Sequence, residues 1–155
     1  MKIIYCGYRF SYAAYLMAAI HTGLYKKDRL PPREAVERQW NVCKKYGEQY
    51  GNLIYMGLYE NLNEVYILGC RKFFEVIKME YKGMNDIFGI DDKIWYIDCR
   101  PWDGFLSNII SRINNYSWLR GLSKGLFSFW LKRIYRSCSE KVQREKQKIM
   151  AGEGC

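Results

Sequence analysis

The first place where this sequence could do chemistry is a strand-to-helix junction near its N-terminus. Ile3–Cys6 is a β-branched and aromatic run, typical of a strand buried on both faces, and Gly7 follows it directly. In open α/β sheets, ligands bind beyond the carboxyl ends of strands, where the next helix offers free N–H groups. Arg9 could donate two hydrogen bonds to a phosphate, and Ser11 resembles a helix N-cap. We therefore expect an anion site formed by Gly7, Tyr8, Arg9 and Ser11.

The same junction lacks the glycine patterns of established phosphate sites. Neither G-x-x-x-x-G-K-[ST] nor G-x-G-x-x-G occurs in the chain, and one glycine cannot form a full phosphate nest. An ordinary strand-to-helix turn with an exposed arginine therefore stays open as the alternative.

Three cysteines, Cys6, Cys70 and Cys99, each end a predicted strand. If the three strands end at one edge of a sheet, the thiols could converge beside arginines, which would lower a thiol pKa and raise its reactivity. The direction of the strand before Cys70 is open. Free cysteine is also a small buried residue in many cores, so core packing is the alternative.

A carboxylate and an arginine follow the last predicted strand. Asp98 could hold Mg²⁺ through water, as in nucleotide enzymes, or cap the next helix, and we add Asp98 and Arg100 to the expected ligand site. We expect no metal centre, because His21 is the single histidine and no Cys/His set has zinc spacing. We expect His21 to cap the end of its own helix, and Asp91–Asp92 to form a solvated turn.

The elements that must position these residues alternate between the periods of strands and helices. We expect a small mixed sheet of about four strands, including one antiparallel hairpin, with helices on both faces and a long C-terminal amphipathic helix. This α/β unit forms one domain over residues 1–150, followed by a frayed tail at 151–155. The expected strands are 3–6, 53–58, 65–69 and 93–99, and the expected helices are 12–21, 33–50, 73–88, 105–113 and 117–150.

The charge of the chain is uneven. The formal net charge is +9, and residues 117–155 carry nine basic and three acidic side chains, so +6 of it lies in the last quarter. The helix there alternates an apolar stripe, which includes Trp118 and Trp130, with a basic one. Its basic side could attract phosphate or another anionic small molecule, nucleic acid or an anionic membrane surface, or it could be the solvated side of a helix that covers the sheet.

The remaining composition limits the function classes further. The chain has no recognised nucleic-acid motif and no apolar run long enough to span a membrane. The unpaired spacing of its six cysteines favours reduced thiols and a cytoplasmic location. An aromatic content of 17% suits a protein-interaction module as an alternative to ligand binding. No reaction or cofactor is indicated, so whether the protein is an enzyme stays open.

Three segments of the chain resemble the DUF3189 family, whose members are uncharacterised proteins found mainly in Firmicutes. They are Met1–Tyr8 with Ala18–Gly23, Leu53–Gly57 with Asn63–Gly69, and 86–92. The family's first loop is glycine-rich and contains a histidine and small hydroxyl residues. Here Arg9-Phe10 stand where two glycines are expected, Tyr12 replaces the histidine, and Ala13-Ala14 replace the hydroxyl pair, whereas His21 and Gly23 match. The departure falls on the segment that we expect to bind the anion.

Overall fold

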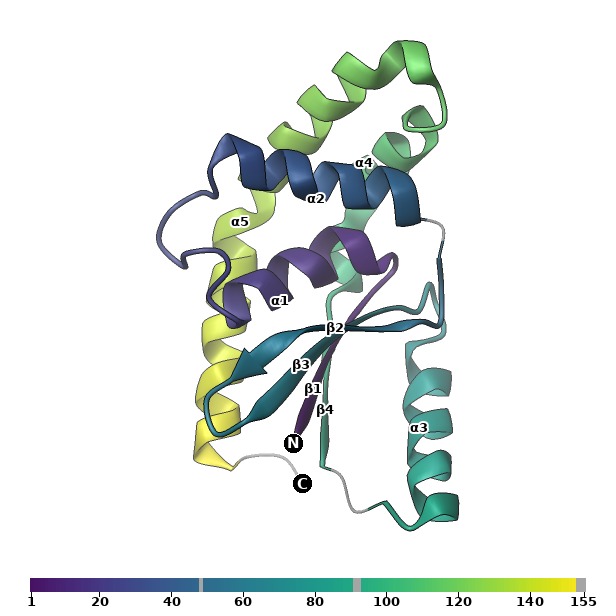
Figure 1. The fold of residues 1–155 in the computed structure, drawn as a ribbon, viewed down its shortest axis with the longest axis vertical. Coiled ribbons are helices and arrows are strands. Elements are labelled where there is room, and N and C mark those ends of the chain that lie inside the picture. Colours follow the sequence, from purple (N-terminus) through teal and green to yellow (C-terminus); the bar gives the residue numbers. More distant parts are fainter. Residues whose placement is uncertain (48, 91–92, 153–155) are drawn as a thin grey trace.

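The computed structural model describes residues 1–47, 49–90 and 93–152 (Figure 1). The strands are β1 (Lys2–Gly7), β2 (Leu53–Tyr59), β3 (Asn63–Gly69) and β4 (Ile94–Asp98). The α-helices are α1 (Tyr15–His21), α2 (Arg33–Tyr46), α3 (Phe74–Phe88), α4 (Arg100–Ile113) and α5 (Arg120–Ala151). A π-helical turn, η1 (Phe10–Ala14), precedes α1, and a 3-10 turn, η2 (Ser117–Leu119), precedes α5.

The four strands form one mixed sheet in the order β2-β3-β1-β4. β1 pairs in parallel with β3 and with β4, whereas β2 and β3 form the antiparallel hairpin. The sequence prediction of a small mixed sheet with one hairpin is therefore confirmed. Because β1, β3 and β4 run the same way, their carboxyl ends meet at one edge, where Gly7 lies beside Gly69 and Cys6 beside Asp98.

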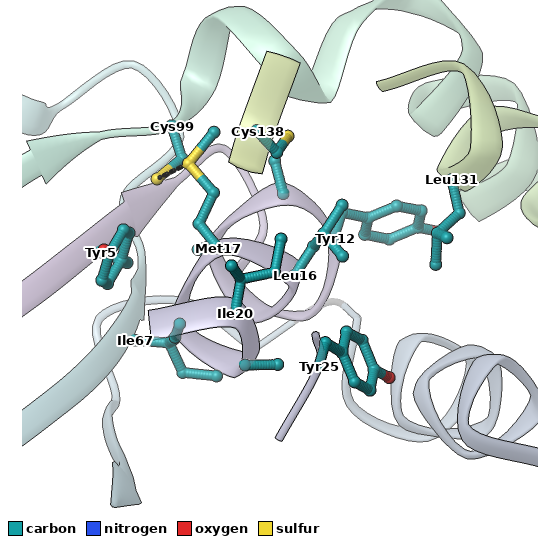
Figure 2. Close-up of a cluster of buried hydrophobic side chains, with 14 of the residues drawn as sticks. Tyr5, Tyr12, Leu16, Met17, Ile20, Tyr25, Ile67, Cys99, Leu131 and Cys138 are labelled. Carbon is teal, nitrogen blue, oxygen red and sulfur yellow. Dashed lines mark hydrogen bonds between the residues drawn. The ribbon is translucent and has the colours of Figure 1, made fainter. Parts of the chain in front are cut away.

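Helices cover both faces of the sheet, as predicted, but very unequally. α1, α2, α4 and α5 gather on one side, and α3 stands alone on the other (Figure 1). The larger core cluster joins sheet residues such as Tyr5 and Ile67 to Met17 of α1 and Trp130 of α5 (Figure 2 draws part of it). The smaller cluster, under α3, consists of Ile4, Cys6, Leu68, Cys70 and Phe74 among the described residues.

The long C-terminal helix is confirmed, and α5 continues to Ala151. Its predicted apolar stripe is only partly used in packing. Trp130 is buried in the core, whereas Trp118 is 81% exposed and Leu122 is 54% exposed. No helix in the described part of the chain combines the length and apolarity that membrane crossing requires.

Several element boundaries differ from the sequence prediction. α2 ends at Tyr46, well before residue 50, and α4 starts at Arg100, five residues earlier than expected. Two residues of the hairpin turn have a positive φ. Asparagine adopts this conformation readily, as Asn61 does (φ 59°), whereas for Leu62 (φ 58°) it is uncommon. The predicted turn at Asp91–Asp92 lies outside the described residues.

Candidate functional site

The backbone amides of the first loop converge on a carboxylate from the protein itself. Asp103, on the first turn of α4, is 3% exposed. Its Oδ2 accepts hydrogen bonds from the backbone N–H of Tyr8 (2.5 Å) and of Arg9 (3.4 Å), and its Oδ1 accepts one from Ala13 (3.0 Å). The side chain of Asp103 therefore occupies the position that the sequence prediction assigned to a phosphate or another anion.

Two glycines let this contact form. An ideal Cβ on Gly7 would lie 2.6 Å from the Arg9 carbonyl oxygen and 3.2 Å from Asp103 Oδ2, so only a glycine fits between the loop and the carboxylate. Gly104 breaks the helical geometry of α4, with φ 56° and ψ −175°. This break follows Asp103 directly, so it separates the turn that carries the carboxylate from the rest of the helix.

The start of the first helix is built differently from the prediction. Ser11 was expected to be the N-cap, but it lies fully buried inside η1, and the N-cap position belongs to Arg9, which makes no side-chain capping bond. The carboxylate of Asp103 supplies the cap instead. Gln39 of α2 donates to the carbonyl oxygens of Ser11 and Tyr12, both at 3.1 Å. These bonds satisfy loop carbonyls where Tyr12 departs from helical φ and ψ.

Aromatic side chains close the loop from the other side. Phe10 is 2% exposed and Tyr12 is fully buried. The Tyr12 ring meets those of Phe127 and Trp130 of α5 edge-on, at centroid distances of 6.0 and 5.4 Å. Tyr12, which stands where the resemblance implies a histidine, thus fills the space beside the loop with a packed aromatic ring.

Arg9 is turned toward α4 and is largely buried. Its Nη1 donates to Oδ1 of Asn108 at 2.7 Å, and its guanidinium lies 5.2 Å from the centre of the Tyr8 ring. The arginine that was expected to be either exposed or aimed at a ligand therefore helps to fasten the first loop to α4.

Burial dominates the electrostatics of Asp103. It raises the pKa of this carboxyl from 3.8 to about 7, against the opposing effect of the three backbone N–H groups and the nearby charge of Arg9. The carboxyl group therefore accepts hydrogen bonds from the first loop in buried surroundings that disfavour its charged form.

Asp98 and Arg100 lie at the same sheet edge but engage each other. The two Asp98 oxygens accept from Arg100 Nε at 2.9 Å and Nη2 at 2.7 Å, and Oδ1 also accepts from the Arg100 backbone N–H. Burial pushes the pKa of Asp98 up, but the hydrogen bonds and charge of Arg100 outweigh it and leave this pKa below its ordinary value. The two roles expected for Asp98 are Mg²⁺ binding and helix capping. The geometry resembles capping, because Asp98 accepts a hydrogen bond from the backbone N–H of Arg100 at the start of α4.

The three strand-end cysteines reach one edge, because β3 is parallel to β1, but they point to opposite faces of the sheet. Cys6 and Cys70 belong to the cluster under α3, whereas Cys99 lies in the larger core, with its Sγ 3.4 Å from Met17 Sδ (Figure 2). Burial raises the pKa of Cys70 to about 11 despite the charge of Arg100, and it also raises the pKa of Cys6 and Cys99. These directions favour the neutral thiol, which is the less reactive form.

His21 does not bind the carbonyls of its helix. It is 1% exposed, its Nδ1 lies 2.5 Å from the Tyr5 hydroxyl, and its ring meets Tyr59 edge-on at 4.4 Å. Burial, helped by the charge of Lys146, lowers the pKa of His21 to about 3, so the ring is neutral at physiological pH. Among the described residues, no group of three or more His, Cys, Asp or Glu side chains is placed to hold a metal ion.

Sequence reasoning did not find a groove that lies beside α5. One hollow of about 730 Å³ lies between α5 and the loop that contains Lys27 and Leu30, and another of about 480 Å³ lies between α5 and α2. Both are lined by Lys132, so we treat them as one feature, the α5 groove. Its basic residues are Lys27, Arg33, Lys124, Lys132, Arg136 and Arg144, and its acidic residues are Asp28, Glu37 and Glu140.

Four of the six basic side chains of the groove form no ion pair with the residues that the structure describes, and Arg33 is one of them. Glu37 pairs with Lys124 at 2.5 Å and Glu140 with Arg136 at 3.1 Å. Lys132, by contrast, forms no ion pair with any residue that the structure describes, and the same holds for Lys27 and Arg144. The basic excess in the last quarter of the sequence indicated one wall of the groove, which is α5. It did not indicate the opposite wall, which includes Lys27 and Leu30.

Comparison with known proteins gives a family and no function. No curated protein and no solved structure matches the chain. A family model described as a protein of unknown function, DUF3189, matches residues 2–147, which is most of the chain and includes the first loop, the sheet and most of α5. The chain therefore belongs to the DUF3189 family.

Proposed function

We propose that this protein is a non-catalytic interaction module that binds an acidic segment of a partner protein in the α5 groove. The observation that carries the proposal is the groove itself, which consists of two hollows that share Lys132, with Lys132 and Arg144 of α5 outside any ion pair of the described residues. From Gly121 to Gln147 the α5 wall spans about 39 Å at a helical rise of 1.5 Å per residue. A basic surface of this kind attracts and orients anionic partners.

The apolar side chains of the groove favour a protein partner. Leu30, which is 44% exposed, and the partly exposed Val36 lie among the basic residues. An amphipathic acidic segment could place apolar side chains on these residues and carboxylates on Lys132 and Arg144. The aromatic rings at the groove offer little area for stacking nucleic-acid bases, because Phe127, Trp40 and Tyr135 are 0%, 1% and 5% exposed.

The shape of the surface argues against a membrane as the partner. Lys132, Arg136 and Arg144 line a hollow whose other wall is the loop around Lys27 and Leu30. A flat bilayer cannot follow such a hollow, whereas a peptide chain can enter it. The proposal also does not rely on the first loop, since Asp103 already holds the amides that an anionic small molecule would need.

A defined peptide tests the proposal. We would measure fluorescence anisotropy with a labelled 20-residue peptide that carries Leu and Glu at helical spacing, and with the same peptide in which Gln replaces Glu. The acidic peptide should bind with an affinity that falls as salt is added, and the Gln peptide should bind much more weakly.

Matched charge reversals locate the binding. The double change Lys132→Glu and Arg144→Glu should weaken binding by about tenfold, as expected for the loss of two exposed charge contacts. The double change Lys78→Glu and Lys82→Glu on α3 alters the net charge equally and should have little effect. Absence of binding by the unaltered protein, or equal losses in both variants, contradicts the proposal. Tighter binding of poly(U) RNA or of anionic vesicles, with the same dependence on Lys132 and Arg144, would overturn the assignment to a protein.

A further inference from the structure

Helix α3 carries more apolar surface than the sheet beneath it can bury. Its inner stripe packs on the sheet, where Phe74 is buried and Ile77 and Tyr81 are partly buried. A second stripe, with Val76 and Ile87 at helical spacing, faces away from this contact. In most helices of globular proteins the side opposite the core is polar, so a second apolar stripe indicates a second contact.

Helix α3 exposes several large apolar side chains. Three of them share the outer stripe by helical spacing, and they are Val76, Met79 and Ile87, at 44%, 65% and 79% exposed. Met84 and Phe88 are also exposed, but their spacing places them on the side of Ile77 and Tyr81. Single exposed apolar residues need no explanation, but a group on one side of one helix is typical of an interaction surface.

The sheet face beside α3 is also only partly covered. Figure 1 shows α3 on this side of the sheet, and α1, α2, α4 and α5 on the other side. Tyr55 of β2 is 52% exposed, and its ring lies 5.5 Å from that of Tyr66 on β3. A mixed sheet with parallel strands is normally covered on both faces, and this face has room for another element.

The charges of α3 fit a second copy of this chain. The helix carries Glu75, Glu80 and Asp86 against Lys78 and Lys82, a net charge of −1 in a chain whose formal net charge is +9. A second copy would be repelled by the basic α5 groove, but on α3 it meets charges of both signs. A surface that carries both signs can face itself across a two-fold axis, which is the usual symmetry of homodimers.

Gly83 adds room for close approach. It lies between Met79 and Ile87 on the outer stripe, and a Cβ placed on it would have no atom within 4 Å outside its own helix backbone. Two helices can come nearest where neither has a side chain, so a glycine at the middle of an apolar stripe suits helix-to-helix contact.

We propose that a second copy of this protein packs its own α3 against the outer stripe of α3, forming a two-fold symmetric dimer. A standard interface buries about 800 Å² per partner. Val76, Met79 and Ile87 form the apolar centre of such a contact, and the charged side chains beside them form its rim. The α5 groove lies on a different helix, on the other side of the sheet, so the dimer and the proposed acidic partner are tested independently.

The mass of the full-length chain in solution tests the dimer. Sedimentation equilibrium at micromolar to 100-micromolar concentrations should give the mass of two copies, and Ile87→Glu should give the mass of one. Leu62→Glu is the matched control, because Leu62 is 78% exposed, nearly the same as Ile87, but lies in the β2–β3 turn. It should leave the dimer intact. Circular dichroism and thermal melting would check that both variants fold.

A second variant separates a specific dimer from unspecific apolar association. Gly83→Leu adds apolar surface at an open position, so unspecific association should increase. In a close α3–α3 contact the leucines would collide, and the dimer should dissociate at concentrations at least tenfold higher than those of the unaltered chain. A chain that is a monomer throughout the range overturns the proposal, as does a dimer unaffected by Ile87→Glu or strengthened by Gly83→Leu.

Discussion

Asp98 and Asp103 lie five residues apart at the carboxyl edge of the same sheet, and their surroundings are opposite. Asp98 is partly exposed and faces the guanidinium of Arg100 at 2.7 Å. Asp103 is buried, and its oxygens face backbone N–H groups of a loop some 90 residues earlier in the sequence. The first carboxylate closes a local turn, and the second joins α4 to the beginning of the fold.

This difference changes how the first loop is understood. A strand, a loop and a helix N-terminus form an anion-binding arrangement in many α/β proteins. Here the arrangement is complete, but the anion belongs to the chain. The sequence indicated a ligand site at this loop. In the structure the loop instead binds Asp103 and so connects β1 to α4.

The largest effect should follow removal of the buried carboxylate. Asp103→Ala leaves the N–H groups of Tyr8 and Ala13 without their acceptor, and each buried donor left without a partner costs about 1–3 kcal/mol. Asp98→Ala removes a partly exposed ion pair, worth about 1 kcal/mol or less. Urea denaturation would measure both changes. Equal losses in the two variants would show that the contrast between the aspartates is wrong.

A smaller loss is expected from Gly104, which lets Asp103 reach the loop. Its φ of 56° with ψ of −175° is a conformation that residues with a side chain adopt at a cost of about 1–3 kcal/mol, so Gly104→Ala should destabilise the fold by that amount. Gly125 in α5 has no positive φ and has open space around it. Gly125→Ala should therefore stabilise the helix by about 0.5–1 kcal/mol. Thermal melts that move in the same direction for both variants contradict this explanation.

A further effect should come from pH, which changes the charge of Asp103 but removes none of its atoms. The pKa of this carboxyl is about 7 in the folded protein and near 3.8 in the unfolded chain. Between these values the folded state keeps a proton that the unfolded state releases, so the contribution of Asp103 to stability falls as pH rises from about 4 to about 7. Asp98, whose pKa is lowered, contributes stability above its ordinary pKa and loses it as pH falls below that value.

The pH dependence is isolated by comparing the unaltered chain with Asp103→Asn. Urea midpoints at about pH 4.5 and pH 7.5 should show a decline in the unaltered chain that is reduced in the variant, because asparagine does not titrate. Parallel declines in the two chains would mean that Asp103 is not the titrating group.

The fold was largely predictable because its signals are local. The apolar run of Ile3–Cys6, the two runs around Asn61 and the capping Gly89 after α3 each specify an element within a few residues, and all of these elements form. The direction of β3 could not be derived, since a strand's side-chain pattern is the same whichever way it runs. The register with β1 settles it as parallel.

The candidate site was predicted less well, because its key contact joins distant segments. The sequence indicated the loop at Gly7 and the aspartates after β4, but nothing local to either one links Asp103 to Tyr8. Gly104 was the available signal, since a glycine directly after an aspartate suggests a break in the helix that frees the carboxylate to cap something else. The α5 groove was missed for a related reason, because its second wall comes from the loop around Leu30.

Chemical rescue of Asp103→Ala tests most directly whether the first loop is an anion site filled from within. Formate has the size and charge of the lost carboxylate, so it should raise the melting temperature of the variant above that in sodium chloride of equal ionic strength. The unaltered chain should respond equally to formate, phosphate and chloride, because its amides already bind Asp103. A specific rise with phosphate in the unaltered chain, or no response to formate in the variant, would contradict this view of the loop.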